Sequence, residues 1–251
     1  MAAIKWYNYH SSEADKMTTI KQIKGLAKNL LDKNIDLVAA GRNSFWLLPI
    51  ESIGRLIHLD RTSNPAYCVA SWYLVEFFMP GVRSSSSLGR CSERIARSEG
   101  FEGGQGWFWS DPTIYDDFLT RVEADALAIL RPLDTTRKCL DFARTRPATV
   151  GRLGLDWHLV ACIALGELDE ARTIWSKIGK HYRNGAVMED AHWQLINDRT
   201  CLIGEPLMAD DRDALATLLH RWEAETIVGS PLEPFWRPSL FPLEEDASAA
   251  P

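Results

Sequence analysis

The spacing of apolar residues changes twice along this chain. Over residues 13–33 apolar side chains recur every three or four positions with lysines on the other faces, which predicts an amphipathic helix. After Gly41 the apolar residues become continuous, aromatic and β-branched, and from about Pro112 the helical spacing returns. This order predicts an α+β protein, with an N-terminal helix and a small antiparallel sheet followed by α-helical hairpins.

The strand-like part contains two long apolar segments on either side of the turn-forming sequence RTSNP. They predict an antiparallel pair of strands at residues 52–60 and 66–78, preceded by a strand at 45–48. Both sets of alternate residues in 66–78 are mostly apolar. We therefore expect this strand to be central in its sheet and covered on both faces, one of them by the first helix.

A serine- and glycine-rich segment follows these strands and interrupts their pattern. We expect a short helix at 92–98 and a last short strand at 107–109. Trp107, Phe108 and Trp109 are consecutive, so on a strand their side chains must point to both sides. They either pack at the edge of the sheet or serve as anchors for a partner, because tryptophan is enriched among residues that dominate binding.

The second half of the chain has the pattern of successive helices, with proline stops and capping residues between them. We expect helices ending at Pro132, running from a cap at Asp134 or Thr135 to Thr145, and at 155–165, 168–178, 191–197 and 211–227. The proline-rich segment after them is not an α-helix, and we expect Phe235, Trp236 and Phe241 to hold it to the body.

These patterns divide the chain into three parts. Residues 1–118 form the α+β part with the antiparallel sheet, 119–229 the helical-hairpin part, and 230–251 a proline-rich C-terminal tail. Charge follows the same division, because residues 1–118 carry 13 basic and 13 acidic side chains while the remainder carries 15 and 21, which accounts for the net charge of −6. This distribution argues against a nucleic-acid groove and favours either a solvated acidic face or a partner with a basic surface.

The helices expected at 155–165 and 168–178 meet at Gly166, where glycine relieves the strain of a left-handed turn. The pattern A-x-x-A-L-G-x-x-x-x-A, from Ala161 to Ala171, resembles one tetratricopeptide helical hairpin. The repeat does not recur at a spacing of about 34 residues, so the sequence indicates stacked hairpins and not a long array. Such a hairpin either fills a core or offers a face to a protein partner.

Sequence signals for a cofactor or a metal ion are weak. The glycine-rich GFEGGQG lacks the lysine of a phosphate loop, and the five cysteines form no CxxC pair, so we expect buried reduced thiols and neither a cofactor nor a metal site. Glu189 and His192 have the spacing of half a di-metal site without a second half. The N-terminus lacks an apolar signal segment and no apolar run is long enough for a membrane helix, so we expect a cytoplasmic protein without membrane contact.

One part of the chain carries a family resemblance. The motif P-x-x-x-I-x-R-x-x-x-x-x-R-T-S runs from Pro49 to Ser63, and an aromatic-rich segment ending at Pro80 follows it. Together with the later blocks LDFARTRP and ALGELDEA, it resembles a family of uncharacterised bacterial α+β proteins similar to toxin-immunity proteins. The resemblance implies a protein that binds and neutralises a toxin, and it implies no catalytic residue.

We therefore expect a binding protein, most plausibly an immunity protein whose acidic surface occludes the basic active-site cleft of a bacterial toxin, without nucleic acid. The alternatives are a small hydrolase or modification-reversing enzyme and a tetratricopeptide-like scaffold or regulator. Arg55, Asp60 and Arg61 are the dense polar set that an enzyme would use, if they do not simply stabilise a turn. The predicted partner-binding residues are Trp107, Trp109, Asp111, Asp116, Asp117, Glu167, Asp169 and Glu170.

Overall fold

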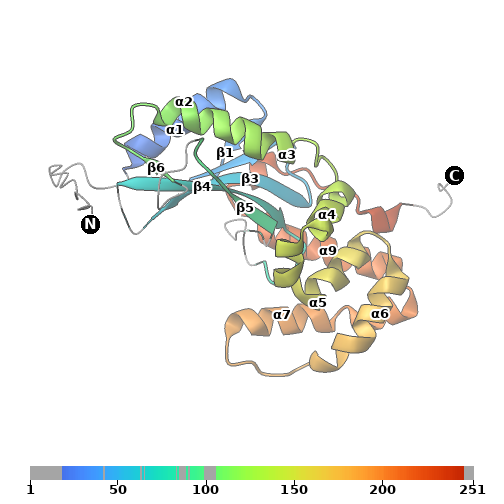
Figure 1. The fold of residues 1–251 in the computed structure, drawn as a ribbon. Coiled ribbons are helices and arrows are strands. Elements are labelled where there is room, and N and C mark those ends of the chain that lie inside the picture. Colours follow the sequence, from blue (N-terminus) through green and yellow to red (C-terminus); the bar gives the residue numbers. More distant parts are fainter. Residues whose placement is uncertain are drawn as a thin grey trace.

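The computed structural model describes residues 19–245, apart from 42, 63, 65, 83, 85–88, 90 and 99–105. An antiparallel sheet lies between two layers of helices (Figure 1). Its strands are β1 (Leu37–Ala39), β2 (Ser44–Leu47), β3 (Ile53–Arg61), β4 (Tyr67–Glu76), β5 (Cys91–Ile95) and β6 (Trp107–Phe108). The α-helices are α1 (Ile20–Lys33), α2 (Ile114–Arg121), α3 (Ala128–Leu130), α4 (Thr136–Thr145), α5 (Pro147–Ala164), α6 (Leu168–Ile178), α7 (Ala191–Cys201), α8 (Gly204–Ala209) and α9 (Arg212–Ile227). The predicted α+β class is confirmed.

The sheet has the order β1-β2-β3-β4-β5, and β6 pairs with the beginning of β4. The antiparallel pair predicted around RTSNP is confirmed as β3 and β4, and the strand before it is β2. The sequence pattern did not reveal β1. The short strand predicted at the consecutive aromatic residues is confirmed as β6.

The helix predicted at 92–98 is wrong, because Cys91–Ile95 forms β5. Cys91 and Ile95 are buried and the residues between them are not, and Ile95 lies opposite Ala70 of β4. This short segment is a strand because it forms hydrogen bonds to the edge of β4. The local preferences of its residues for helix or strand do not predict such a tertiary contact.

Helix α1 begins with a capping box, in which the Thr19 hydroxyl accepts from the Gln22 main chain at 3.2 Å and the Gln22 side chain accepts from the Thr19 main chain at 2.7 Å. The predicted part of this helix at 13–18 lies outside the described residues. Leu26 and Leu30 are buried in the same core cluster as Trp72 of β4, so the first helix covers one face of the sheet, as predicted.

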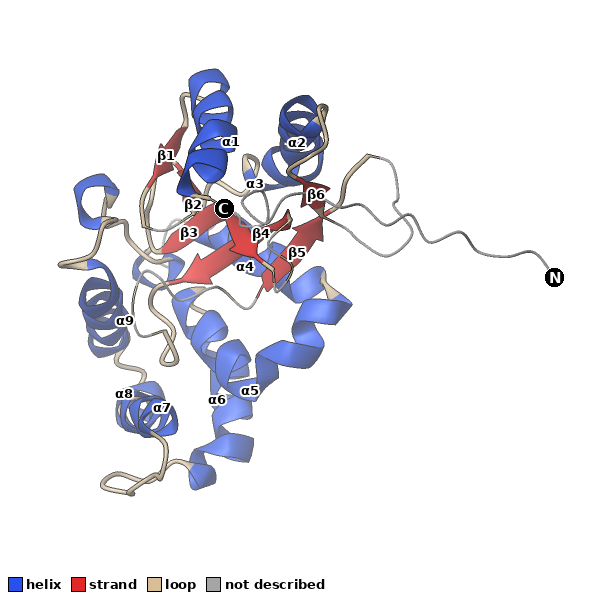
Figure 2. Cartoon of the chain, turned by 90° about the vertical axis from the view of Figure 1, so that its left-hand side faces the viewer, coloured by secondary structure: helices blue, strands red, loops and turns tan. Residues whose placement is uncertain are grey.

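Helix α9 and the following tail cover the other face of the sheet, as both views show (Figures 1 and 2). Val75 and Phe77, at the end of β4, share a buried cluster with Ile227 of α9 and with Leu232. The Thr226 hydroxyl also donates to the Phe77 carbonyl at 3.0 Å. The prediction that the central strand is covered on both sides is therefore confirmed.

The predicted helices of the second half are present, but α5 begins at Pro147, eight positions before the helix expected at 155–165, and the non-helical Gly154, with φ of 65°, separates its two parts. Thr135 caps α4 by accepting from the Lys138 main chain at 3.2 Å, and Asp211 caps α9 in the same way from Ala214 at 2.9 Å. A π-helical segment, Val122–Leu127, joins α2 to α3. Helix α7 continues to Cys201 and is followed by α8, which the sequence pattern did not reveal.

The C-terminal tail is held to the body, as predicted. Phe241 is completely buried, with its ring 5.0 Å from that of Phe78, and Trp236 donates to the buried carboxylate of Glu223 at 2.9 Å. His220 of α9 lies between two carboxylates, 3.3 Å from Glu223 and 2.9 Å from Glu244. These hydrogen bonds raise the pKa of His220.

One contiguous cluster of buried residues runs from Ile23 to Leu243, so the three predicted parts of the chain share a core. All five cysteines are free, and four of them are buried. Within the described ranges, no helix has the length and apolar character needed to cross a lipid bilayer.

Candidate functional site

The structure separates the predicted partner-binding residues into two groups. Trp107, Trp109, Asp111, Asp116 and Asp117 belong to β6, the start of α2 and the turn between them. The second group belongs to the α5–α6 hairpin, far from α2 in both views (Figures 1 and 2). The eight residues therefore do not form one continuous surface.

Trp107 is packed inside the protein and is not exposed to a partner. Its side chain has 0% exposure, and its ring meets Phe118 edge-on at 5.4 Å. Its indole nitrogen donates to the Asp117 carboxylate at 2.7 Å, and the Arg97 guanidinium lies 3.9 Å from the same oxygen. The structure thus supports the edge-packing interpretation for Trp107, and burial of the whole ring gives the physical reason.

The carboxylates beside Trp107 are engaged in local structure. Asp111 accepts hydrogen bonds from the main chain and hydroxyl of Thr113, at 2.8 and 2.7 Å, and pairs with Arg97. These contacts lower the pKa of Asp111. Asp116 and Asp117 lie in the first turn of α2, where negative charge stabilises a helix. Only Asp116 among the three carboxylates is exposed, and Trp109 is half-buried.

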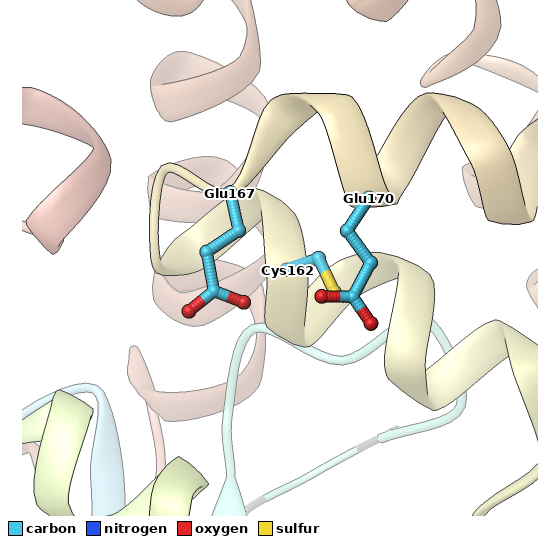
Figure 3. Close-up of side chains that lie close together, drawn as sticks. All are labelled: Cys162, Glu167 and Glu170. Atoms are coloured by element: carbon cyan, nitrogen blue, oxygen red, sulfur yellow. The ribbon is translucent and has the colours of Figure 1, made fainter.

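Two residues of the second group, Glu167 and Glu170, lie beside Cys162, and these three side chains could together hold a cation. Cys162 of α5 and Glu167 and Glu170 at the start of α6 place their donor atoms within 4.8 Å of one another (Figure 3). The chain reverses direction at a tight turn at Gly166, where φ is 78°, and α6 packs against α5.

Arg144 of α4 contacts two of these three side chains. Its guanidinium donates to Glu167 at 2.7 Å and to the Cys162 sulfur at 3.1 Å. Burial raises the pKa of Cys162 to about 11, so the sulfur is a neutral thiol at neutral pH and a poor metal ligand. The arginine already neutralises the carboxylate, and we assign the cluster a structural role that ties α4 to the α5–α6 hairpin.

The helical part nevertheless carries a continuous acidic surface. It consists of carboxylates at the start of α6 and around the start of α9, and we call it the acidic end: Glu167, Asp169, Glu170, Asp210, Asp211 and Asp213. Arg172 of α6 joins the two segments, because it donates to Asp169 of its own helix at 2.8 Å and pairs with Asp210, the residue that ends α8 just before α9. Five of the six carboxylate residues are exposed and Glu167 is half-buried.

The C-terminal tail packs beside the acidic end. The Arg212 guanidinium donates twice to the Leu243 carbonyl, at 2.9 and 3.1 Å, and the exposed Glu245 follows two residues later. Arg212 and Arg172 are therefore engaged in contacts that hold three chain segments together. The acidic end keeps an excess of negative charge, because its six carboxylates outnumber the four arginines in contact with this part of the chain, which are Arg137, Arg144, Arg172 and Arg212.

Only half of the acidic end, Glu167, Asp169 and Glu170, was among the residues predicted from the sequence to bind a partner. Residues 167–170 were predicted to bind a partner, and the acidic run at 210–213 precedes an expected helix. The two segments are about 40 positions apart in the sequence, and only the packing of α6 against α8 brings them together. Both segments lie at helix starts, where carboxylates are common because they stabilise the helix dipole. This shared position is visible in the sequence, but it does not indicate that the two helix starts lie side by side.

Two residues of the polar set proposed for an enzyme, Arg55 and Asp60, are not brought together, and the side chain of Arg61 lies outside the described part of the structure. Arg55 is buried and donates to the carbonyls of Leu130, Leu48 and Pro49, at 3.2–3.3 Å, and not to Asp60. Asp60 instead lies 3.2 Å from His58. The cavity beside Arg55 has room for no more than about one water molecule, so it does not admit a substrate.

Comparison of the chain with protein-family models, curated proteins and solved structures gives no match. The class of protein is therefore defined by its own fold and surface. It is an α+β protein whose sheet is covered on both faces and whose helical part ends in an exposed acidic surface.

Proposed function

We propose that this chain is a binding protein that places its acidic end against the basic cleft of a partner protein, as an immunity protein does when it neutralises a toxin. The observation that carries the proposal is the acidic end itself. Six carboxylates from the start of α6 and the junction of α8 with α9 lie on one surface and outnumber the four arginines that contact this part of the chain. The resemblance expected from the sequence of residues 45–81, to bacterial proteins similar to immunity proteins, would agree with this function.

The expected mechanism is occlusion guided by charge. A surface of one sign attracts a surface of the opposite sign over roughly 10 Å at moderate salt, which raises the association rate. Because the starts of α6 and α9 also carry positive helix dipoles, part of the acidic field is cancelled locally. The exposed carboxylates therefore contribute mainly to the rate of association and to the choice of partner, and tight binding needs an apolar contact as well.

The test uses the genes that flank this one. Each neighbouring gene is expressed in bacterial cells with and without this chain, and growth is measured. The proposal expects that one neighbour arrests growth and that this chain restores it. The double variant Asp169→Lys/Asp213→Lys should lose most of the rescue, because both exposed carboxylates belong to the acidic end.

The matched control is Asp32→Lys/Asp134→Lys, which makes the same change in net charge at exposed positions on α1 and just before α4. It should rescue growth as the unmodified chain does. Association of the purified pair should slow at least tenfold for the acidic-end variant and lose its salt dependence. Equal rescue and equal rates for both double variants would refute the proposal, as would the absence of a toxic neighbour.

A further inference from the structure

A serine, a histidine and an aspartate are connected by hydrogen bonds on the sheet. The Ser44 hydroxyl lies 2.8 Å from Nδ1 of His58, and Nε2 of the same ring lies 3.2 Å from an Asp60 carboxylate oxygen. An ionised carboxylate only accepts hydrogen bonds, so the proton of the neutral ring is on Nε2. Nδ1 is then unprotonated and accepts from the Ser44 hydroxyl. A hydroxyl that donates to such a base can act as a nucleophile.

The register of the strands brings these three side chains together. Ser44 of β2 is directly opposite His58 of β3, and Asp60 follows His58 by two positions. Directly opposed residues and alternate residues of a strand project from the same face of a sheet, so the three side chains share one face. The order of nucleophile, base and orienting acid is that of a serine hydrolase, with the roles of the two ring nitrogens exchanged.

Solvent reaches this part of the face. Leu56, which precedes His58 on the same side of β3, is buried in the cluster that contains Ile227 of α9. Further along β3 the cover ends, because the side chains of His58 and Asp60 are 18% and 40% exposed. Ser44 itself is 9% exposed. A small substrate can therefore approach the histidine, and the serine is shielded from most of the surrounding water.

Two neighbouring side chains can balance negative charge on a substrate oxygen. Ser71 of β4 is opposite His58 and Arg94 of β5 is opposite Ser71, so the Cα atom of Arg94 lies two strand spacings, about 10 Å, from that of His58 on the same row. The Tyr73 ring meets the His58 ring edge-on at 6.4 Å. Burial raises the pKa of Tyr73, so its hydroxyl keeps its proton at neutral pH and can donate it in a hydrogen bond.

We propose that Ser44, His58 and Asp60 form a hydrolytic site for carboxylic esters. The Ser44 oxygen attacks the ester carbon, and its proton passes to Nδ1 of His58 while Nε2 keeps its hydrogen bond to Asp60. His58 gives this proton to the alcohol that leaves, and the acyl group stays on Ser44. A water molecule then attacks the acyl group, its proton passes through His58 to the Ser44 oxygen, and the acid is released.

This activity does not depend on the proposed binding function. Ser44 and His58 belong to the sheet, whereas the acidic end lies on the helical part of the chain (Figure 1). Growth rescue tests the acidic end and ester chemistry tests the sheet site, so either proposal can fail without the other.

The experiment treats the full chain with a fluorophosphonate, a reagent whose phosphorus bonds to an activated serine oxygen and releases fluoride. Peptide mass spectrometry should find the phosphonate on Ser44. His58→Gln should slow this labelling about 100-fold, because glutamine does not take up the proton. Burial lowers the pKa of His58, against the opposing effect of Asp60, so the labelling rate should fall at acid pH with a midpoint below about 6.5.

Ser92→Ala is the matched control, because Ser92 of β5 is half-buried on the same face, where it is opposite Tyr73. This variant should be labelled on Ser44, and should hydrolyse p-nitrophenyl acetate, at the rates of the unmodified chain. Ser44→Ala should lose both reactions. Peptide mapping of the unmodified chain locates the phosphonate even if Ser44→Ala does not fold.

Three results would overturn the inference. The first is an unlabelled Ser44, which would mean that its hydrogen bond to His58 only joins β2 to β3. The second is equal labelling of Ser44 and Ser92, since the reagent would then be reacting with accessible hydroxyls in general. The third is a labelling rate that His58→Gln leaves unchanged in a chain with an unaltered circular dichroism spectrum.

Discussion

Replacing Trp107 by alanine tests whether this side chain belongs to the core or to a binding surface. The ring is completely buried, stacks edge-on against Phe118 and donates to Asp117. Removal of a buried tryptophan costs about 3–5 kcal/mol, from lost transfer energy and from the cavity that remains. Domains of this kind are stable by about 5–15 kcal/mol, so Trp107→Ala should remove a large share of the stability.

Two further variants separate the contribution of the buried ring from that of its hydrogen bond and from the effect of truncating an exposed tryptophan. Trp107→Phe keeps an aromatic ring against Phe118 but removes the donor to a charged acceptor, which costs about 1.5–3 kcal/mol. Trp193→Ala truncates a ring that is 59% exposed, and surface changes of this type stay within about 0.5 kcal/mol. The expected order of stability is Trp193→Ala, then Trp107→Phe, then Trp107→Ala.

Urea unfolding followed by far-ultraviolet circular dichroism is the appropriate assay, because tryptophan fluorescence changes when a tryptophan is removed. The free energy of unfolding comes from linear extrapolation. If Trp107→Ala proves too unstable to purify, Trp107→Phe still provides the comparison with Trp193→Ala. A loss below about 1 kcal/mol for Trp107→Ala, or equal losses for both alanine variants, would show that the assignment of core and surface is wrong.

Three other outcomes are expected. The raised pKa of His220 means that its contribution to stability is complete below the unfolded-state pKa of about 6.5 and is lost as pH rises through the folded-state pKa, so His220→Gln should lower the melting temperature most at acid pH. Gly166→Ala should cost more than Gly185→Ala by calorimetry, because both positions have positive φ but only at Gly166 would the methyl group meet another atom, 3.1 Å away. Cys201 is the one half-buried thiol, so Cys201→Ser should remove the fastest phase of modification by a thiol reagent at pH 8, and an unchanged fast phase would contradict this.

The fold was predictable where a pattern was long and local. The spacing of apolar residues predicts the strands β3 and β4 and the helices α4, α6 and α9. Capping residues such as Thr135 and Asp211 indicate where the helices begin. Short elements such as β1, β5 and α8 were not predicted, because three to six residues carry too little pattern to outweigh tertiary contacts.

The candidate surfaces were less predictable because exposure is a property of packing. The sequence contains ten tryptophans, and nothing local distinguishes the buried Trp107 from the exposed Trp193. Trp107 is buried because α2 supplies both Phe118 and a carboxylate that accepts from the indole. Trp193 is exposed because α7 uses Ile196 and Asn197 for its inward contacts, which leaves the first turn on the outer side.

The acidic end shows how one set of side chains can serve both the fold and the surface. Asp169 and Asp213 lie in first turns, where a carboxylate stabilises its helix whether or not a partner exists. Two acidic helix starts would therefore occur in many proteins without any binding role. What distinguishes this chain is that Arg172 of α6 pairs both with Asp169 of its own helix and with Asp210 between α8 and α9, and so holds the two groups of carboxylates on one surface. The stability of the single helices does not require that arrangement, since each start is stabilised separately, whereas the proposed binding role needs the carboxylates on one face.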